Sequence, residues 1–302
     1  MTAALGLGTY RVRNVKSAAR IAVQAGAPWI DTAPNYGDGL ALHDLGSVLR
    51  ESPRAPLVAT KAGFFTRSQG RTALGLGLLT EHDASAGHCL DPRFVAYQVN
   101  EAVALLGRVD LVFVHNPERA GRGVDRAVMH WRLREAFTAL EEQVQQGRIP
   151  GYGVATWSGL LEGAFSVPDL LALAREAAGS TDPHLIAVQM PVSLISDAPI
   201  TQALNGGGPL VQAKDAGLIT FGSAPLHGGE LLDAITPELV DLIRPGLSAG
   251  AAGVLAAGSC PALDFVLTST ANREHWDDAA KALAAPLTAE QLRRVTDELA
   301  TG

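Results

Sequence analysis

Residues 93–115 read RFVAYQVNEAVALLGRVDLVFVH, and this stretch contains the unit from which the fold is built. Apolar residues recur with helical period from Arg93 to Leu106, and Gly107 is a typical helix stop. The apolar run Leu111–His115 then follows as a short strand. The same unit recurs along the chain, and this alternation predicts an α/β fold with a parallel sheet.

Eight strand-like runs make up the alternation, and one further helix follows the last of them. The runs are Ala4–Tyr10, Trp29–Asp31, Leu57–Lys61, Leu111–His115, Tyr152–Thr156, Leu185–Gln189, Leu218–Ser223 and Asp264–Ser269. The helical patterns are Val15–Ala25, Ala41–Arg50, Arg93–Leu106, Trp131–Gln146, Pro168–Ala177, Leu210–Ala216, Ala249–Ala257, Asn272–Leu283 and a last one, Ala289–Leu299. Thr288 fits the N-cap of that last helix, with Gln291 as its capping-box partner.

Eight alternating strands predict one (β/α)8 TIM-barrel domain over residues 1–302, a parallel eight-stranded barrel with an extra C-terminal helix. An open, doubly wound sheet is the rival architecture. The segment Gly6–Tyr10 lacks the G-x-G-x-x-G spacing of a dinucleotide-binding turn, which weakens that alternative. The longest irregular stretch is Gly63–Asp91, which we interpret as a loop on the substrate side or as a flexible insertion.

The composition excludes several classes of protein. Apolar residues make up 47% of the chain, which suits segments buried on both faces. The net charge is −7 and the basic residues are scattered, so no nucleic-acid or anionic-membrane partner is expected. Cys89 and Cys260 are far apart, which indicates free thiols, no metal site and a cytoplasmic location. No secretory signal is recognisable at the N-terminus, and the charge-free stretch Gly246–Leu263 is interpreted as a buried helix running into a strand.

Polar residues end several of the predicted strands. They are Asp31, Lys61, His115 and Gln189, and Tyr36 lies in the loop after Asp31. Each one alone has an ordinary explanation, such as a helix cap, a solvated side chain or a turn residue. Barrel enzymes carry their active sites at the carboxyl ends of the strands, however, and a buried lysine needs a partner such as Asp31. We therefore expect an active site there.

The residues at these strand ends resemble those of the aldo-keto reductase superfamily, and the resemblance covers essentially the whole chain. The segment Asp31–Gly37, DTAPNYG, matches the family's D-T-A-x-x-Y-G motif. Lys61 and His115 match its strand-three lysine and strand-four histidine. Further similar segments are Gly6–Tyr10, Leu105–Asp110, Gly147–Val154, Gln189 and Ala224–Gly229.

The resemblance implies an NAD(P)H-dependent oxidoreductase that interconverts a carbonyl (an aldehyde, ketone or sugar) and an alcohol. Tyr36 would be the general acid and base, because a nearby Lys61 ammonium lowers the pKa of a phenol from its usual value of about 10. Asp31 would hold Lys61 in place, and His115 would orient the carbonyl oxygen. The partner is thus a small carbonyl or sugar substrate, and bacterial aldose 1-dehydrogenase-like members are the most similar in character.

The cofactor implied is NADP(H), favoured over NAD(H) because Arg273 suits a 2′-phosphate. The positions that correspond to cofactor contacts are Gly8, Thr9, Tyr10, Asp31, Thr156, Gln189, Ser223, Ala224, Pro225, Leu226, Ser269, Thr270, Arg273 and His275. Three positions depart from the family pattern, namely Ala155, Ser223 and Ala279. These departures affect cofactor contacts and leave the four catalytic positions intact.

Two alternative functions stay open. A strand-end lysine in a barrel is also the arrangement of a Schiff-base lyase, with Lys61 as nucleophile. The chain could instead be an NADP(H)-binding barrel with a slow or regulatory role. The substrate depends on the segments Gly63–Asp91, Glu118–His130 and Leu194–Gly208, and Phe64, Phe65 and Trp157 are candidates for an apolar wall.

Overall fold

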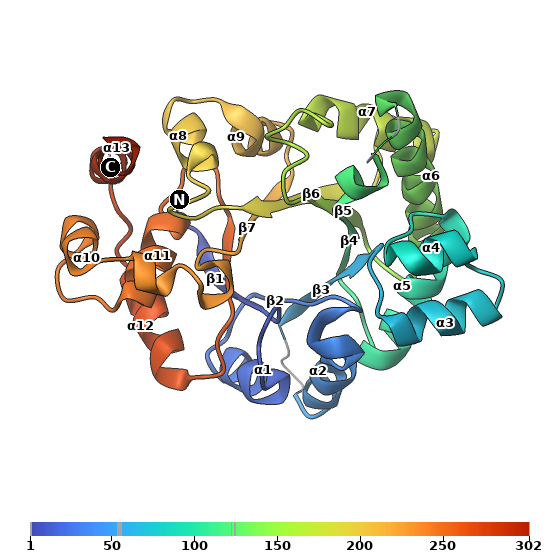
Figure 1. Cartoon of the computed structure of the whole chain (residues 1–302), viewed down its shortest axis with the longest axis horizontal. Helices are drawn as coiled ribbons and strands as arrows, with labels where there is room; N and C mark the ends of the chain where they lie inside the picture. The colour runs from blue at the N-terminus through green and yellow to red at the C-terminus, as the bar shows by residue number, and fades with distance from the viewer. Residues whose placement is uncertain (1, 53–55, 122, 124, 302) are drawn as a thin grey trace. The chain divides into compact units, whose positions relative to one another are not determined.

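Eight parallel strands form a closed barrel in the order β1-β2-β3-β4-β5-β6-β7-β8. Figure 1 labels the strands β1 to β7. The computed structural model describes residues 2–52, 56–121, 123 and 125–301. The strands are β1 (Ala4–Gly8), β2 (Trp29–Asp31), β3 (Leu57–Ala62), β4 (Leu111–His115), β5 (Tyr152–Ala155), β6 (Leu185–Pro191), β7 (Ile219–Ser223) and β8 (Phe265–Thr268). The predicted eight-stranded barrel is confirmed, and each strand lies where its apolar run predicted it.

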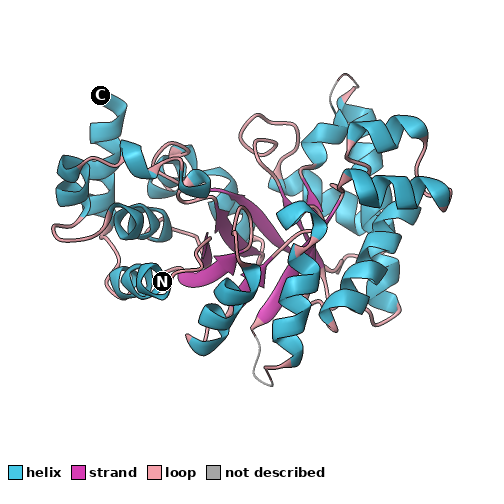
Figure 2. Cartoon of the chain, turned by 60° about the horizontal axis from the view of Figure 1, so that its bottom comes forward, coloured by secondary structure: helices cyan, strands magenta, loops and turns pink. Residues whose placement is uncertain are grey.

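Helices occupy most of the chain between the strands (Figure 2). They are α1 (Val15–Gln24), α2 (Ala41–Arg50), α3 (Arg67–Gly75), α4 (Glu81–Ala86), α5 (Pro92–Leu106), α6 (Arg126–Gln145), α7 (Val167–Ala178), α8 (Ala198–Leu204), α9 (Gly208–Asp215), α10 (Pro237–Ile243), α11 (Ala249–Gly258), α12 (Arg273–Leu283) and α13 (Ala289–Thr301). Short 3-10 helices are η1 (Tyr36–Gly39), η2 (Pro117–Gly121), η3 (His227–Gly229) and η4 (Leu232–Ala234). The predicted helices, including the extra C-terminal one, are confirmed, whereas α3, α4, α8 and α10 were not predicted.

Local sequence signals fix several of the helix ends. Gly107 ends α5 in the left-handed conformation with a φ of 81°, which an L side chain rarely adopts. At the start of α13 the Thr288 hydroxyl accepts a hydrogen bond from the Gln291 N–H at 3.2 Å. The Gln291 side chain in turn accepts one from the Thr288 N–H at 2.9 Å, so the predicted capping box is confirmed.

The chain divides into two compact units, residues 1–30 with 189–302 and residues 31–188, and each is described by itself. In the second unit β3 pairs with β4 and β4 with β5, all in parallel. Lys61 lies opposite Phe113, and His115 lies opposite Ala155. In the first unit β8 pairs with both β1 and β7 in parallel.

Helices α2 and α5 approach each other closely within the 31–188 unit. A Cβ atom at Gly46 of α2 would lie 2.1 Å from the backbone oxygen of Leu105 in α5. No side chain fits in that space, so Gly46 sets the distance between the two helices. Helix α5 also packs against β3, whose side chains are buried almost throughout.

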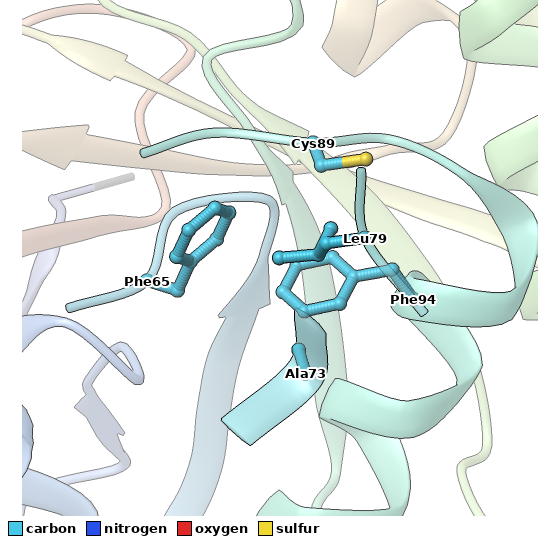
Figure 3. Packing of buried hydrophobic residues seen from close by; sticks show 5 residues of the cluster. All are labelled: Phe65, Ala73, Leu79, Cys89 and Phe94. Atoms are coloured by element: carbon cyan, nitrogen blue, oxygen red, sulfur yellow. The ribbon is translucent and has the colours of Figure 1, made fainter. Parts of the chain in front are cut away.

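The segment Gly63–Asp91, expected to be irregular, is ordered and carries α3 and α4. Each helix begins with a capping box, Thr66 with Gln69 and Thr80 with Asp83. Its apolar side chains form a cluster with α5 (Figure 3), which comprises Phe65, Ala73, Leu79, Cys89 and Phe94. The expectation of an irregular loop is therefore wrong, because local caps and this cluster stabilise two helices that apolar periodicity alone did not reveal.

Both cysteines and the charge-free stretch are parts of the packed interior. Burial raises the pKa of the Cys89 thiol to about 11 and that of Cys260 to about 12, so both are protonated at neutral pH. Within Gly246–Leu263 the helix α11 is buried over most of its length, and β8 follows it, as predicted. Among the helices that the structure describes, none combines the length and the apolar character of a membrane span.

Candidate active site

The four residues expected to carry the chemistry all lie in the 31–188 unit. Asp31 ends β2, Lys61 lies next to the last residue of β3, and His115 ends β4. Tyr36 opens η1, directly after the loop that follows β2. Since the strands are parallel, their carboxyl ends face the same way, and the structure brings these side chains together. We refer to Asp31, Tyr36, Lys61 and His115 as the candidate tetrad.

Asp31 and Lys61 form a buried ion pair. The Lys61 Nζ atom lies 2.5 Å from Asp31 Oδ2 and 3.1 Å from the backbone oxygen of Thr32. Lys61 is 2% exposed and Asp31 is 4% exposed, so water contributes little to either charge. Burial lowers the pKa of Lys61, while the charge and hydrogen bond of Asp31 act in the opposite direction. The pair therefore holds a desolvated ammonium group in one position.

Tyr36 lies against this ammonium group. The Lys61 Nζ atom is 5.1 Å from the centroid of the Tyr36 ring, within the range of a cation–π contact. The Tyr36 ring also meets the His115 ring edge to face, with centroids 6.1 Å apart. The Tyr36 N–H donates to the backbone oxygen of Ala33 at 3.1 Å, which fixes the start of η1. The phenol thus has the lysine and the histidine as neighbours.

His115 is held as a neutral imidazole. Burial lowers its pKa well below 6.5, and the nearby Lys61 charge lowers it further. Its Nδ1 atom is buried without a hydrogen-bond partner among the residues that the structure describes, as is Asn35 Oδ1 beside Tyr36. An unpaired buried polar atom costs about 1–3 kcal/mol, so a bound ligand that supplied a partner would recover part of that cost.

Two residues that the sequence did not single out, His88 and Gln98, hold the backbone around His115 through hydrogen bonds. His88 contacts His115 itself, and Gln98 contacts the neighbouring Gly63 and Phe64. The His88 Nε2 atom lies 2.8 Å from the His115 backbone oxygen, and because that oxygen can only accept, Nε2 carries the proton. Burial lowers the pKa of His88 to about 4, so it too is neutral. The Phe64 ring contacts both histidine rings, with centroid distances of 4.6 Å to His88 and 4.8 Å to His115.

Gln98 of α5 fixes the backbone that carries Phe64. It accepts a hydrogen bond from the Gly63 N–H at 2.7 Å and donates one to the Phe64 oxygen at 2.9 Å. Gly63 has a φ of 135°, and a Cβ atom there would lie 2.9 Å from His88 Nε2. A buried glutamine on the apolar face of α5 was a usable sequence signal, whereas nothing near His88 indicated its role.

The three residues predicted to form an apolar wall lie in different surroundings. Phe64 lies against His115. Phe65 instead belongs to the buried cluster of Figure 3, so its assignment to the wall is wrong. Trp157 is half exposed in the loop after β5. Of the segment Glu118–His130, residues 122 and 124 lie outside the described part of the chain.

Thr156, a predicted cofactor contact, already has partners within the protein. Its hydroxyl donates to Glu118 Oε2 at 2.9 Å and accepts from the Gly159 N–H at 2.8 Å. The other Glu118 oxygen accepts from the N–H groups of Trp157 and Ser158. The same glutamate therefore shapes the loop after β5, and a cofactor amide at Thr156 would share the hydroxyl with Glu118.

Most of the other predicted cofactor contacts lie in the unit formed by residues 1–30 and 189–302. Gly8 ends β1, and a Cβ atom there would lie 3.3 Å from Ser269 Oγ, so these two positions are adjacent. Gln189 is buried in β6, and Ser223 ends β7. Ala224 has a φ of 51°, an unusual value for a residue with a side chain. The rest of this set is Thr9, which is buried, Tyr10, which is partly exposed, and Pro225 and Leu226, which follow Ala224.

The N-terminus of α12 carries the residues expected to hold a phosphate. Asn272 caps the helix by accepting from the Glu274 N–H at 2.9 Å, and Thr270 accepts from the Asn272 N–H at 3.1 Å. Arg273 lies in the first turn, but its Nε atom is 2.9 Å from both carboxylate oxygens of Asp277. A 2′-phosphate would therefore compete with Asp277 for this guanidinium group.

His275 follows in the same turn of α12 and is exposed. Within the described residues, no group of three or more His, Cys, Asp or Glu side chains is arranged to hold a metal ion. The arrangement in the 31–188 unit can do acid–base chemistry, because it joins a phenol, a buried ammonium group, a carboxylate and a neutral imidazole.

Known proteins are similar to this chain in sequence and in fold. The sequence pattern described as the Aldo/keto reductase family matches residues 2–238. The D-threo-aldose 1-dehydrogenase of a Pseudomonas species is 31% identical over 220 residues, which are 67% of this chain and 60% of that protein. The pyridoxal 4-dehydrogenase of Microbacterium luteolum is 30% identical over 145 residues, 43% of this chain and 42% of that protein. The chain thus spans less than two thirds of the length of these two relatives.

A solved structure extends the likeness in fold to almost the whole chain. The aldo-keto reductase from Klebsiella pneumoniae in complex with NADPH superposes with a TM-score of 0.67 and 18% identity. The match covers 99% of this chain and 95% of that one. At this identity the likeness concerns the fold alone, and it agrees with the closed barrel described above.

Proposed function

Because the chain belongs to the aldo/keto reductase family, we propose that it is an NAD(P)H-dependent oxidoreductase that interconverts a carbonyl compound and an alcohol. The observation that carries the proposal is the contact of the Tyr36 ring with the buried Lys61 ammonium group, which is paired with Asp31. This arrangement gives a phenol the neighbour that it needs to release a proton near neutral pH.

Tyr36 is the proposed general acid. In carbonyl reduction its O–H bond breaks as the O–H bond of the product alcohol forms, which leaves a phenolate that later regains a proton from water. Lys61 stabilises this phenolate, because a buried positive charge 5.1 Å from the ring acts with little screening by water. Asp31 keeps the ammonium group charged and fixed. In alcohol oxidation the phenolate accepts the proton.

His115 positions the carbonyl group. A neutral imidazole has one N–H donor, and the depressed pKa of His115 keeps it neutral at physiological pH. A hydrogen bond from this ring to the carbonyl oxygen polarises the C=O bond and directs the oxygen toward Tyr36. The backbone contact from His88 and the packing of Phe64 hold the imidazole in place.

The coenzyme supplies the hydride when it is bound. The residues present fit such a group, because the first turn of α12 offers backbone N–H groups and Arg273 for a phosphate. Ser269 beside Gly8 offers a hydroxyl. We propose NADPH over NADH, since Arg273 is suited to a 2′-phosphate. Titration of NADPH and of NADH by protein fluorescence tests this preference, and equal affinities would refute it.

The buried state of Lys61 argues against the lyase alternative. A Schiff-base nucleophile has to be a neutral amine that reaches the substrate. Lys61 is 2% exposed, and its Nζ atom is bound to Asp31 and to the Thr32 oxygen. The alternative of a slow or regulatory barrel predicts slow turnover or none, so the rate measured in the experiment below also decides between it and the proposed enzyme.

The test is reduction of 4-nitrobenzaldehyde, followed by NADPH absorbance, in the wild type and in Tyr36→Phe. We expect Tyr36→Phe to lower kcat by at least about 100-fold, because the proton donor is lost. The Kd for NADPH, measured separately by fluorescence, is expected to stay within about twofold. Tyr97→Phe, on α5 and packed against Phe94, is the matched control and should keep wild-type activity. A Tyr36→Phe protein with wild-type kcat would refute the role of Tyr36.

A further inference from the structure

A pocket of about 390 Å³ lies within the 31–188 unit, and its lining residue His88 contacts the backbone oxygen of His115. It lies among α4, the turn before α5, η2 and α6, and it is lined by residues of both segments expected to select the substrate. The side chains that decide its chemistry are His82, His88, Arg119, Trp131 and Arg132. The pocket therefore joins two guanidinium groups to an indole, and one of its walls, His88, touches His115.

Arg119, which lines this pocket, is linked to the candidate tetrad through the Phe64 ring. Its guanidinium carbon lies 5.1 Å from the centroid of the Phe64 ring, and that ring lies 4.8 Å from the His115 ring. One aromatic ring thus contacts both the guanidinium group and the imidazole.

Arg119 has no carboxylate partner among the residues that the structure describes, although three acids line the same pocket. Asp83 caps α4 through Thr80, and Asp91 caps α5 through the Arg93 N–H. Glu135 lies 3.0 Å from a guanidinium nitrogen of Arg134. These acids are engaged elsewhere, so the Arg119 charge is available to a ligand.

Arg132 lies in the same pocket with one nitrogen already used. Its Nη1 atom donates to the Ala120 backbone oxygen at 2.7 Å, which places the guanidinium group next to η2. The indole of Trp131 is about half exposed there and provides an apolar surface. Guanidinium groups bind carboxylates in a planar, two-pronged manner. The three acids around the pocket oppose a phosphate monoester with nearly two negative charges more strongly than a carboxylate with one.

We propose that Arg119 and this pocket bind the carboxylate of the substrate, so that the chain reduces aldehydes that carry a carboxylate on an aromatic or other apolar frame. The inference rests on the proposed function, and it names the substrate class of the same site. Arg119 acts as a specificity-determining residue that touches the substrate at the end remote from the reacting carbonyl.

The test compares two substrates that differ in one charge, 4-carboxybenzaldehyde and its uncharged methyl ester, methyl 4-formylbenzoate. We expect the wild type to prefer the carboxylate in kcat/KM. Arg119→Gln should lower kcat/KM for the carboxylate by about 10- to 100-fold, mainly through KM, as expected for loss of a hydrogen-bonded charge. It should change the value for the methyl ester by less than about twofold, because no charge is lost there.

Further variants separate charge from fold. Arg119→Lys keeps the charge and should retain most of the preference for the carboxylate over the methyl ester. Arg132→Gln should lower kcat/KM for the carboxylate less than Arg119→Gln does, because one Arg132 nitrogen is bound to the Ala120 oxygen. Arg71→Gln removes an exposed positive charge of α3 outside the pocket and should change neither substrate. Equal effects of Arg119→Gln on both substrates, or no effect on either, would overturn the inference while leaving the proposed function in place. A preference for 4-formylphenyl phosphate over the carboxylate would overturn the assignment of a singly charged ligand.

A protein that reduces neither aldehyde with NADPH or NADH would contradict the proposed function, and binding then decides the inference. The probe is 4-(hydroxymethyl)benzoate, observed by ligand-detected NMR with the full-length chain. Binding to the wild type that disappears in Arg119→Gln and persists in Arg71→Gln supports the carboxylate site. Absence of binding to the wild type, or equal binding to Arg119→Gln, would overturn it.

Discussion

The ion pair between Asp31 and Lys61 gives the first prediction. Both partners are buried, so replacing Asp31 leaves the Lys61 charge buried without its carboxylate. In Asp31→Asn the Lys61 ammonium loses the carboxylate at 2.5 Å and keeps the backbone oxygen of Thr32 at 3.1 Å. Breaking a buried pair in this way costs about 3–5 kcal/mol. That is a large share of the roughly 5–15 kcal/mol by which most domains are stable. The assay is urea unfolding followed by circular dichroism.

The loss of stability in Asp31→Asn should depend on pH with a definite sign. Asp31 raises the pKa of Lys61 and burial lowers it, so removal of Asp31 takes this pKa further below its usual 10.5. Between that lowered pKa and 10.5 the unfolded chain binds more protons than the folded one, so the free energy of unfolding rises with pH. The difference in free energy of unfolding between the wild type and Asp31→Asn should therefore be largest near pH 7 and smaller at pH 9.

A second substitution separates the lone charge from the loss of Asp31 itself. Asp31→Asn/Lys61→Met removes both charges, and we expect it to be at least about 1 kcal/mol more stable than Asp31→Asn. Asp182→Asn, an exposed change of the same kind, should stay within about 0.5 kcal/mol of the wild type. If Asp31→Asn lost less than about 1 kcal/mol, or if its deficit did not change with pH, the buried pair would not have the energetic role argued here.

Three other predictions concern acid stability, helix packing and coenzyme choice. Burial lowers the pKa of His88 from 6.5 to about 4, so the free energy of unfolding of the wild type should fall by up to about 3 kcal/mol as the pH falls across that range. In His88→Gln this fall, measured by urea unfolding, should be correspondingly smaller. Gly46→Ala should destabilise by about 3 kcal/mol or more in the same assay, because its Cβ atom would overlap the Leu105 oxygen. Asp277→Ala should release Arg273 and tighten NADPH binding by roughly twofold in a fluorescence titration, with NADH unchanged.

Each of these predictions has a matched control. His43→Gln removes a mostly exposed histidine, so it should keep the acid sensitivity of the wild type. Gly75→Ala, in α3 with nothing within 4 Å of the new atom, should be neutral or stabilising by up to about 1 kcal/mol. Asp278→Ala removes the neighbouring acid of α12 and should not affect NADPH binding. The acid-stability prediction is wrong if His88→Gln loses as much stability in acid as the wild type. The packing prediction is wrong if Gly46→Ala is as stable as the wild type, and the coenzyme prediction is wrong if Asp277→Ala and Asp278→Ala have equal effects.

Much of the barrel was predictable because its signals are local. The helix α2 coincides with the prediction Ala41–Arg50, since the apolar residues recur on one face. The helix α3 was missed because few of its residues are apolar, so its periodicity is faint. Its capping box at Thr66 and Gln69 was nevertheless present in the sequence, and weighing caps as heavily as periodicity would have found it.

Some residues of the candidate site were predictable from local sequence signals, and others were not because they depend on contacts between residues far apart in the sequence. The positions of Asp31, Lys61 and His115 follow from strand ends, and their proposed roles follow from the family motif. The contact of His88 with the His115 backbone joins residues 27 positions apart in the sequence. No periodicity or motif encodes such a pairing, because it arises from how the segment after β3 folds over the barrel strands of its own unit. The contact of Arg119 with Phe64 was beyond sequence reasoning for the same reason.

The division of the chain at residues 31 and 189 has a consequence for how its specificity could be redesigned. The candidate tetrad and the pocket lined by Arg119 are encoded by one uninterrupted stretch, whereas most of the positions expected to hold the coenzyme are encoded by the two flanking stretches. Exchanging the flanks with those of a homologue would thus exchange most of the positions expected to hold the coenzyme, together with the segment Leu194–Gly208, while the candidate tetrad is inherited intact. Under the proposed function, a chimeric chain of this kind would vary the coenzyme positions without altering the residues proposed to transfer the proton.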